Sequence, residues 1–169
     1  MSHDDARGRV ETAFTTYHRS FFLIELLALE ISYRDDACVV RFPVDDFLRD
    51  PEGAYPGGLL ATVMDVAMAH LCKHLNGHAG ATITLNTEFL QPLLTGPAVC
   101  EARFSRHGRS IGFAEAEIRD GEERLVAQGT AVSVVRLIGT WARVPQRRLW
   151  LLLVDVTRLD GCGPSAVFS

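Results

Sequence analysis

One long apolar segment limits the folds open to this chain more than any other feature. It reads YPGGLLATVMDVAMAHL, residues 55–71, and its apolar run is interrupted by a single acid, Asp65. A helix that is apolar over most of its surface is stable only when other elements cover it, so this segment predicts a buried helix. Its end is predicted at Asn76-Gly77, because glycine is common just after a helix.

The residues after this helix change from helical spacing to alternation, which is typical of strands. Strand-like runs are predicted over residues 81–91, 97–105, 109–119 and 124–135, with Gly and Pro turns between them. In the first run the two faces are predicted to carry different residues: Ile83, Leu85 and Phe89 on one, and Thr82, Thr84, Asn86 and Glu88 on the other. Hairpins can join these strands directly, without crossover helices, so the sheet is expected to be antiparallel.

The residues before the apolar helix are predicted to add one helix and two strands. Residues 6–30 have helical character, and residues 31–44 are interpreted as two short strands broken at Asp35-Asp36. The whole pattern predicts an α+β fold, in which a curved antiparallel sheet wraps around the apolar helix. Such a sheet has edge strands that need partners, so we expect the chain to form a dimer.

Composition and charge indicate the number of domains, the class of partner and the location to expect. A chain of 169 residues most simply forms one domain. Its net charge of −4, with no basic block, argues against nucleic acid as a partner. The N-terminus, MSHDDARGRVE, has no apolar signal core, so a cytoplasmic location is expected.

Cysteines and histidines give no strong metal or disulfide pattern. The cysteines are far apart, with no CxxC pair, and we expect reduced, unligated thiols. His70, His74 and His78 are spaced by four residues, so a helix could present the first two to a metal. Gly77 interrupts the helix before the third, and no metal site is predicted.

The C-terminal residues 137–169 include one apolar run. Their apolar run LWLLLVDV is too short to span a bilayer, so no membrane span is predicted. The segment is compatible with an extra strand or helix, with a cover over a neighbouring subunit, or with a poorly ordered tail.

Asp65 is the acid in the middle of the apolar helix. At 100° per residue it lies away from the polar side and shares its face with mostly small residues, namely Gly58, Ala61, Thr62, Met68 and Ala69. A buried carboxylate is costly unless something stabilises the anion. Two interpretations stay open, an Asp tied to nearby amides or hydroxyls for stability and a catalytic acid.

The start of the same helix has features of an anion site. Gly57 and Gly58 would let a ligand reach the free backbone N–H groups of the first turn, at the positive end of the helix dipole. Pro56 suits a helix start, because its missing N–H would have no partner there. A simple loop-to-helix junction would look the same, so this pattern alone does not indicate function.

The combination of these features resembles a known family. Gly-Gly followed by an apolar helix, with an acid seven residues after the second glycine, resembles the hotdog-fold acyl-CoA thioesterases of the PaaI-like group, which are related to 4-hydroxybenzoyl-CoA thioesterases. The resemblance continues through TITLNTEFLQP, HGRSIGFAEAEI and RDGEERLVAQGTAVSVV, and covers residues 20–136. It implies a hotdog domain between an N-terminal helical segment, residues 1–19, and a C-terminal extension, residues 137–169.

The resemblance also implies roles for single residues. Asp65 would act as nucleophile or as general base for water, and the N–H of Gly57 would bind the thioester carbonyl. Thr82 would orient the acid or the water. The substrate site would also include Asp50, Pro56 and Gly58 near the helix start, and Gly108, Arg109 and Ser110 in the turn that lies along coenzyme A. Arg103, Arg106 and Arg109 would meet its phosphates.

The same resemblance implies a homo-oligomer. In such enzymes the acid and the oxyanion donor come from different subunits, so the dimer is the catalytic unit, and we expect a dimer of dimers. Coenzyme A would be part of the substrate, with no separate cofactor, and the acyl group is left open.

Two positions depart from the family motif. The family usually has His-Gly-Gly where this chain has Pro56, and an Asn six residues before that motif where this chain has Asp50. An ionised Asp can only accept hydrogen bonds, so a donor to the carbonyl would have to come from elsewhere, for example Ser20 or Asn86.

The expected function is hydrolysis of an acyl-CoA thioester to a free acid and coenzyme A. The departures favour an alternative, a hotdog module that binds acyl-CoA without turnover as a sensor or assembly part. A dehydratase of this fold would need a histidine near the helix start, and none stands between Asp45 and Ala69.

Overall fold

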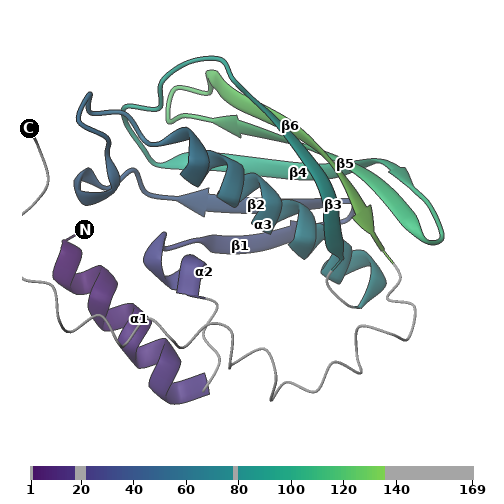
Figure 1. The fold of residues 1–169 in the computed structure, drawn as a ribbon, viewed down its shortest axis with the longest axis horizontal. Coiled ribbons are helices and arrows are strands. Elements are labelled where there is room, and N and C mark those ends of the chain that lie inside the picture. The colour runs from purple at the N-terminus through teal and green to yellow at the C-terminus, as the bar shows by residue number, and fades with distance from the viewer. Residues whose placement is uncertain (1, 18–21, 78–79, 136–169) are drawn as a thin grey trace, which may run out of the picture. The chain divides into compact units, whose positions relative to one another are not determined.

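A computed structural model describes residues 2–17, 22–77 and 80–135 of the chain (Figure 1). Expectations for residues 137–169, Ser20 and His78 lie outside these residues. The helices are α1 (His3–Tyr17), α2 (Phe22–Leu26) and α3 (Gly57–Asn76), with a short 3₁₀ turn, η1 (Asp46–Leu48). The strands are β1 (Glu30–Arg34), β2 (Ala37–Phe42), β3 (Ala81–Phe89), β4 (Ala98–His107), β5 (Ile111–Arg119) and β6 (Leu125–Val134).

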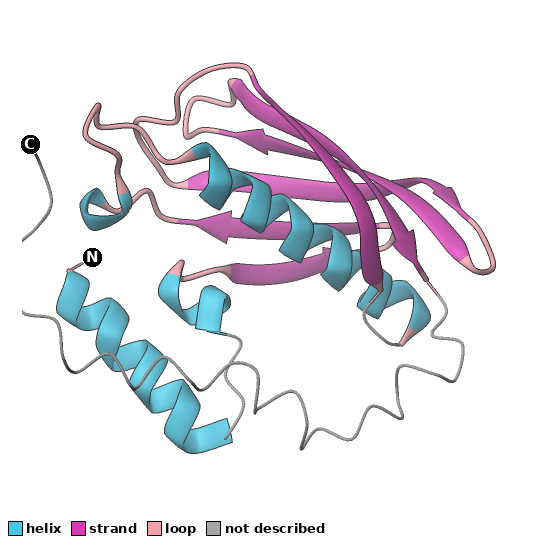
Figure 2. Ribbon diagram, viewed as in Figure 1, coloured by secondary structure: helices cyan, strands magenta, loops and turns pink. Residues whose placement is uncertain are grey.

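The six strands form one antiparallel sheet in the order β1-β2-β4-β5-β6-β3. Helix α3 lies diagonally across one face of this sheet and contacts all six strands (Figure 2). The predicted α+β fold, an antiparallel sheet wrapped around one apolar helix, is therefore confirmed. The order also places β1 and β3 at opposite edges, because the chain crosses the sheet through α3 before it forms β3.

The core lies between α3 and the sheet. Its helix side comes from residues spaced three and four apart, and those that are almost fully buried include Leu60, Val63, Met64, Ala67, Met68 and Leu71. The helix ends as predicted: Gly77 has φ 76°, a left-handed conformation that favours glycine, and its N–H donates to Lys73 O at 2.9 Å.

The predicted helix over residues 6–30 is wrong in its last part. Helix α2 ends at Leu26, and Ala28 takes a left-handed conformation with φ 48° before β1 begins at Glu30. Leu27 and Leu29, on either side of this turn, are 0% and 7% exposed. Their burial explains an apolar run that continues through the turn, which sequence spacing alone cannot distinguish from helix.

Strand β3 departs from the alternation predicted for it. Thr82 pairs with Ser133 but Thr84 pairs with Val132, so Ile83 is one extra residue, a β-bulge. The bulge returns Thr82 to the face that carries Leu85, the face toward α3. Ile83 is 55% exposed rather than packed with Leu85 as the alternation predicts.

Candidate active site

Asp65 lies two turns into α3 and is half-buried. Its Oδ1 accepts a hydrogen bond of 2.7 Å from the hydroxyl of Thr82, at the start of β3. Within the described residues Oδ2 has no hydrogen-bond partner, so one carboxylate oxygen is oriented and the other is open. The Thr82 side chain is exposed, so this pair can be reached from outside the core. The structure thus brings together two of the three residues expected to act in catalysis.

The start of α3 is uncapped. Pro56 is the N-cap residue and makes no side-chain cap. Its carbonyl accepts hydrogen bonds from Leu59 N and Leu60 N, while the N–H groups of Gly57 and Gly58 have no partner among the described residues. Two donors are therefore available at the positive end of the helix dipole, where an oxyanion would be stabilised.

Gly57 lies close to the side chain of Phe89. A Cβ there would lie 3.2 Å from the ring of Phe89, which is the last residue of β3. A Cβ on Gly58 would meet nothing within 4 Å, so packing does not require glycine there. The Gly57 N–H is thus kept next to the end of β3, whereas Asp65 is next to its start.

Gly57 and Asp65 are too far apart to act together within one chain. Eight residues of helix separate them, which is about 12 Å along the axis. A donor that binds a carbonyl oxygen and a base that acts on the same carbonyl carbon must lie within a few ångströms of each other. The single chain therefore presents two half-sites.

A pocket of about 240 Å³ opens beside Gly57. Most of its lining is apolar, from Tyr55, Leu60, Phe89, Leu90, Pro92 and Leu93, with Gly57 and Gln91. Tyr55 is buried, its N–H donates to Leu93 O at 2.9 Å, and its ring packs against Phe42. Burial, together with the nearby Asp45, raises the pKa of Tyr55, which therefore stays neutral at physiological pH.

Asp50 stabilises the loop before α3 by hydrogen bonds. Its Oδ1 accepts the N–H of Ala54 at 2.8 Å, and its own N–H donates to Ala54 O at 2.9 Å. Gly53 has φ 85° and completes this turn. The carboxylate therefore holds the loop that leads to Pro56 and Gly57, a role that the sequence motif did not indicate.

The turn formed by Gly108, Arg109 and Ser110 joins β4 to β5. A Cβ on Gly108 would collide with the carbonyl oxygen of Ile111, so only glycine fits there. Arg109 and Ser110 are exposed. Ile111 pairs with Val134, which pairs with Ala81, so this turn lies at the same end of the sheet as Thr82.

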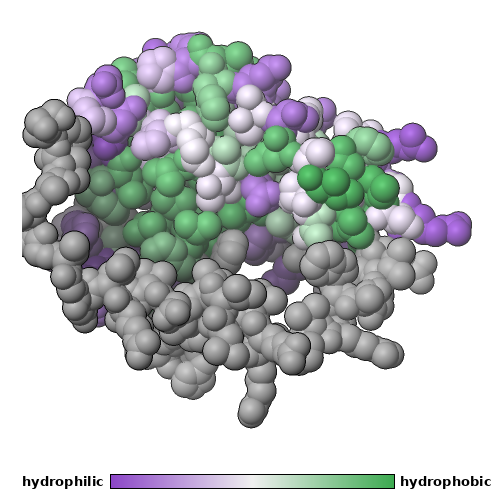
Figure 3. All heavy atoms as spheres, viewed as in Figure 1, coloured by the Kyte–Doolittle hydropathy of each residue, from purple (hydrophilic) through white to green (hydrophobic). Residues whose placement is uncertain are grey.

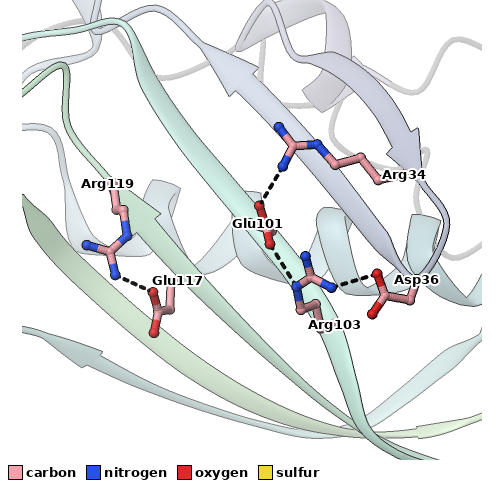
Figure 4. Close-up of polar contacts among 6 residues, drawn as sticks. All are labelled: Arg34, Asp36, Glu101, Arg103, Glu117 and Arg119. Carbon is pink, nitrogen blue, oxygen red and sulfur yellow. Dashed lines mark hydrogen bonds and ion pairs between the residues drawn. The ribbon is translucent and has the colours of Figure 1, made fainter. Parts of the chain in front are cut away.

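Arg103 lies away from this site. It is on the sheet face turned away from α3, and it forms ion pairs with Asp36 at 2.6 Å and Glu101 at 2.8 Å (Figure 4). The hydrogen bond to Glu101, followed by that to Asp36, raises the pKa of its guanidinium. Three arginines were expected to bind the phosphates of coenzyme A. Of these, Arg103 is already ion-paired within the chain, on the sheet face turned away from α3.

Two residues of the half-sites were missed by the sequence reasoning. Phe89 contacts Gly57, although the sequence shows it only as one apolar residue of an alternating strand. Tyr55 lines the pocket, and the one available signal is its position just before Pro-Gly-Gly.

The described residues contain no group of three or more His, Cys, Asp or Glu side chains that could hold a metal ion. No helix among them is long and apolar enough to cross a membrane. Cys38, Cys72 and Cys100 form no disulfide within the described residues, and burial raises the pKa of Cys38 to about 12.

Comparison with known proteins identifies relatives. A family model described as thioesterase superfamily matches residues 55–127. A protein of Thermoplasma volcanium named as a candidate esterase is 39% identical over 51 residues, a match covering 30% of this chain and 38% of that relative's length.

The matches to solved structures cover more of this chain than the family model does. The conserved protein PA5202 of Pseudomonas aeruginosa is 30% identical with a TM-score of 0.62, covering 69% of this chain and 94% of that one. A phenylacetic acid degradation-related protein of Ralstonia eutropha, named as a candidate thioesterase, is 24% identical with a TM-score of 0.63, covering 75% and 98%. With the fold described above, the family match and the 30% identical structure show that the chain belongs to the thioesterase superfamily and has its hotdog fold.

Proposed function

We propose that this protein is an acyl-CoA thioesterase, which hydrolyses the thioester to a free carboxylic acid and coenzyme A. The observation that carries the proposal is the hydrogen bond from Thr82 to Asp65, which orients a half-buried carboxylate and leaves its second oxygen open. Membership of the thioesterase superfamily supports thioester cleavage as the reaction.

Asp65 acts in this proposal as a general base. Its open oxygen takes a proton from water while the water oxygen bonds to the thioester carbon. The carbonyl oxygen gains negative charge and is stabilised by the Gly57 N–H. The carbon–sulfur bond then breaks, and the thiolate takes the proton held by Asp65, so atoms and charge balance. In the alternative form of this mechanism, Asp65 attacks the thioester carbon directly and forms an anhydride. Water then cleaves this anhydride.

The two half-sites meet in a dimer paired through β3. This edge strand spans nine residues, and several of its side chains are exposed, including Ile83 and Phe89. A strand of this kind tends to pair with another chain unless something covers it. The opposite edge, β1, has only five residues and carries Glu30 and Arg34 at its ends, features that discourage pairing.

Antiparallel pairing of two β3 strands about a two-fold axis has a direct consequence. It sets the start of one strand beside the end of the other. Thr82, with Asp65, is at the start, and Phe89, with Gly57, is at the end. Each dimer would therefore form two complete sites, each with the acid of one chain and the helix N–H of the other.

A second candidate function is an acyl-CoA-binding module without turnover. It is favoured by the helix start, where Pro56 offers no side-chain donor and Asp50 is committed to Ala54. Such a protein would bind the ligand with the same pocket and lack the polarisation that hydrolysis needs.

One experiment separates the two functions. Wild type is mixed with acyl-CoAs carrying short, long and aryl acyl groups, and thiol release is measured beside the affinity for each. Thiol release that Asp65→Asn abolishes supports the enzyme, with Asp35→Asn, an exposed acid in a turn, as the matched control. Tight binding with no thiol release from any of them would support the binding module.

A further inference from the structure

A second β-bulge lies near the end of strand β4. Ser105 is one extra residue between the pairs that Phe104 and Arg106 form with β5. Because of this extra residue, Phe104 and His107 lie on the same face of the sheet, the face toward α3. The bulge therefore does for His107 what the bulge in β3 does for Thr82: it turns a polar side chain toward the helix.

His107 contacts Asn76, the last residue of α3. The atoms Nε2 of His107 and Oδ1 of Asn76 are 3.0 Å apart. Nδ2 of Asn76 donates to Cys72 O at 3.0 Å, so the amide oxygen faces the histidine and Nε2 of His107 is the donor. Within the described residues this is the only hydrogen bond between β4 and α3, and it ties the end of the strand to the end of the helix.

The imidazole of His107 also packs against an aromatic ring. Its centroid lies 4.6 Å from that of Phe104, with 20° between the two ring planes. Gly112 on β5 makes room for this pair, because a Cβ there would lie 2.6 Å from the Phe104 ring. His107 is thus held by a hydrogen bond and a stacked ring, although its side chain is exposed.

The turn of residues 108–110 comes directly after His107 and joins β4 to β5. Its far end is also fixed, because Ser110 O accepts a hydrogen bond of 3.0 Å from Val135 N, just after β6. The contact between His107 and Asn76 fixes the near end. The turn is therefore held from both sides, once by the helix and once by the neighbouring strand.

Two arginines flank His107, and both are exposed. Neither Arg106 nor Arg109 forms an ion pair within the described residues, whereas Arg103 on β4 and Arg119 on β5 are paired. Figure 3 shows hydrophilic surface at this end of the β4–β5 hairpin, at the right of the view. Arginines without an internal partner are available to phosphate groups. The acid–hydroxyl pair of the candidate site lies at the same end of the sheet.

We propose that His107 is a positioning residue for the nucleotide end of coenzyme A. Its contacts with Asn76 and Phe104 fix the turn of residues 108–110, so that Arg109 is held where the phosphates of the ligand bind. A turn that is already fixed loses less conformational freedom on binding, so the contact raises affinity and takes no part in the reaction. The inference rests on the proposed function, because it takes coenzyme A as the group that this turn binds.

The test compares ligands with and without the nucleotide, on the full chain. His107→Leu removes the donor and keeps an apolar group against Phe104. It is expected to raise the Kd for coenzyme A, measured by calorimetry, roughly 3- to 10-fold, the usual effect of one hydrogen bond. KM for an acyl-CoA should rise by the same factor with kcat unchanged. The same acyl group on pantetheine, which lacks the nucleotide, should be hydrolysed with the wild-type kcat/KM.

Two further variants test the hydrogen bond itself. His107→Gln retains an N–H donor for Asn76 and is expected to recover most of the affinity for coenzyme A. Asn76→Leu should weaken binding by the same factor as His107→Leu, and the double variant should bind no more weakly than either single one. The matched control is His74→Leu. His74 stacks on Tyr33, with centroids 4.7 Å apart, at the opposite edge of the sheet, so its loss should leave both ligands unaffected.

The inference is overturned by an unchanged Kd for coenzyme A in a His107→Leu protein whose melting temperature shows that it is folded. An equal loss of kcat/KM on the acyl-pantetheine would also overturn it, because the effect would then not concern the nucleotide. Additive effects of the His107 and Asn76 substitutions would do the same. A wild type that binds coenzyme A and releases no thiol would refute the proposed function and leave the calorimetric result on His107 standing.

Discussion

The hydroxyl of Thr82 on β3 donates a hydrogen bond of 2.7 Å to Oδ1 of Asp65 on α3. This contact depends on the bulge at Ile83, which shifts the pairing between Thr82 and Thr84. With strict alternation Thr82 would lie on the same face as Thr84, away from the helix. A bulge in an edge strand thus turns one hydroxyl toward the carboxylate, a use of bulges that recurs beside active sites.

The first prediction concerns the Thr82 hydroxyl. Thr82→Val keeps the shape and removes the donor, and a hydrogen bond to a charged group is worth about 1.5–3 kcal/mol. We expect kcat to fall roughly 10- to 100-fold with KM nearly unchanged, because the hydroxyl orients the acid and does not hold substrate. Steady-state kinetics on one good acyl-CoA give both values.

Thr84→Val is the control for this change, because Thr84 lies on the same strand and faces the other side. It should leave both constants at the wild-type level. If Thr82→Val raised only KM, Thr82 would contribute to substrate binding and not to the orientation of Asp65.

The second prediction concerns the bulge itself. Deleting Ile83 removes the bulge but leaves Thr82 directly before Thr84 and opposite Ser133, so alternation still turns Thr82 toward α3. Thiol release should therefore stay near the wild-type rate and well above that of Thr82→Val. The melting temperature should change little, because Ile83 is exposed. A loss of activity as large as in Thr82→Val, in a folded deletion variant, would show that the Thr82–Asp65 bond needs the bulge itself.

The third prediction is complementation between two inactive proteins. Gly57→Pro removes one helix N–H at a position where proline fits a helix, and the nearby Phe89 ring is half exposed and can move. Asp65→Asn removes the acid. Neither protein alone should hydrolyse, whereas mixed dimers should contain one site with both groups.

Random exchange of two chains gives half mixed dimers, each with one working site. The recovered rate should therefore approach about a quarter of wild type for a two-fold dimer with independent sites. Chain exchange is verified by mass, using one tagged partner. Verified exchange with no recovered thiol release would mean that each site is built within a single chain.

The fourth prediction concerns Asp50. Asp50→Asn retains an oxygen that can accept the Ala54 N–H, so the loop and the fold should be unaffected. The amide adds a donor and removes a negative charge near the helix start. If this side chain faces the carbonyl, kcat should rise by a few-fold to about 10²-fold, the usual worth of one oxyanion donor.

Kinetics and thermal melting of Asp50→Asn are compared with wild type. Asp50→Ala serves as the structural control, because it removes the acceptor for Ala54 as well as the charge and should lower the melting temperature. An Asn variant with wild-type kcat and stability would limit Asp50 to its role in the loop.

The sequence alone predicted the central helix, the end of that helix and the antiparallel strands that follow it. Its apolar segment with one acid predicted the central helix, because a run that long and apolar must be covered on most sides. Gly77 predicted the helix end, since a left-handed residue there favours glycine. The change of period after the helix predicted antiparallel strands, because side chains alternate between the faces of a strand.

The tertiary structure determines which of these residues contact one another. The bulge at Ile83 depends on how β3 pairs with β6, and a pairing partner cannot be read from the alternation of one strand. The contact between Gly57 and Phe89 joins residues that are distant in sequence and lie together only because α3 crosses the sheet. The spacing of Gly57 and Asp65 along one helix keeps them about 12 Å apart, because helical rise is the same whatever the sequence. That distance, together with the open edge of β3, is why a complete site is expected to need a second chain.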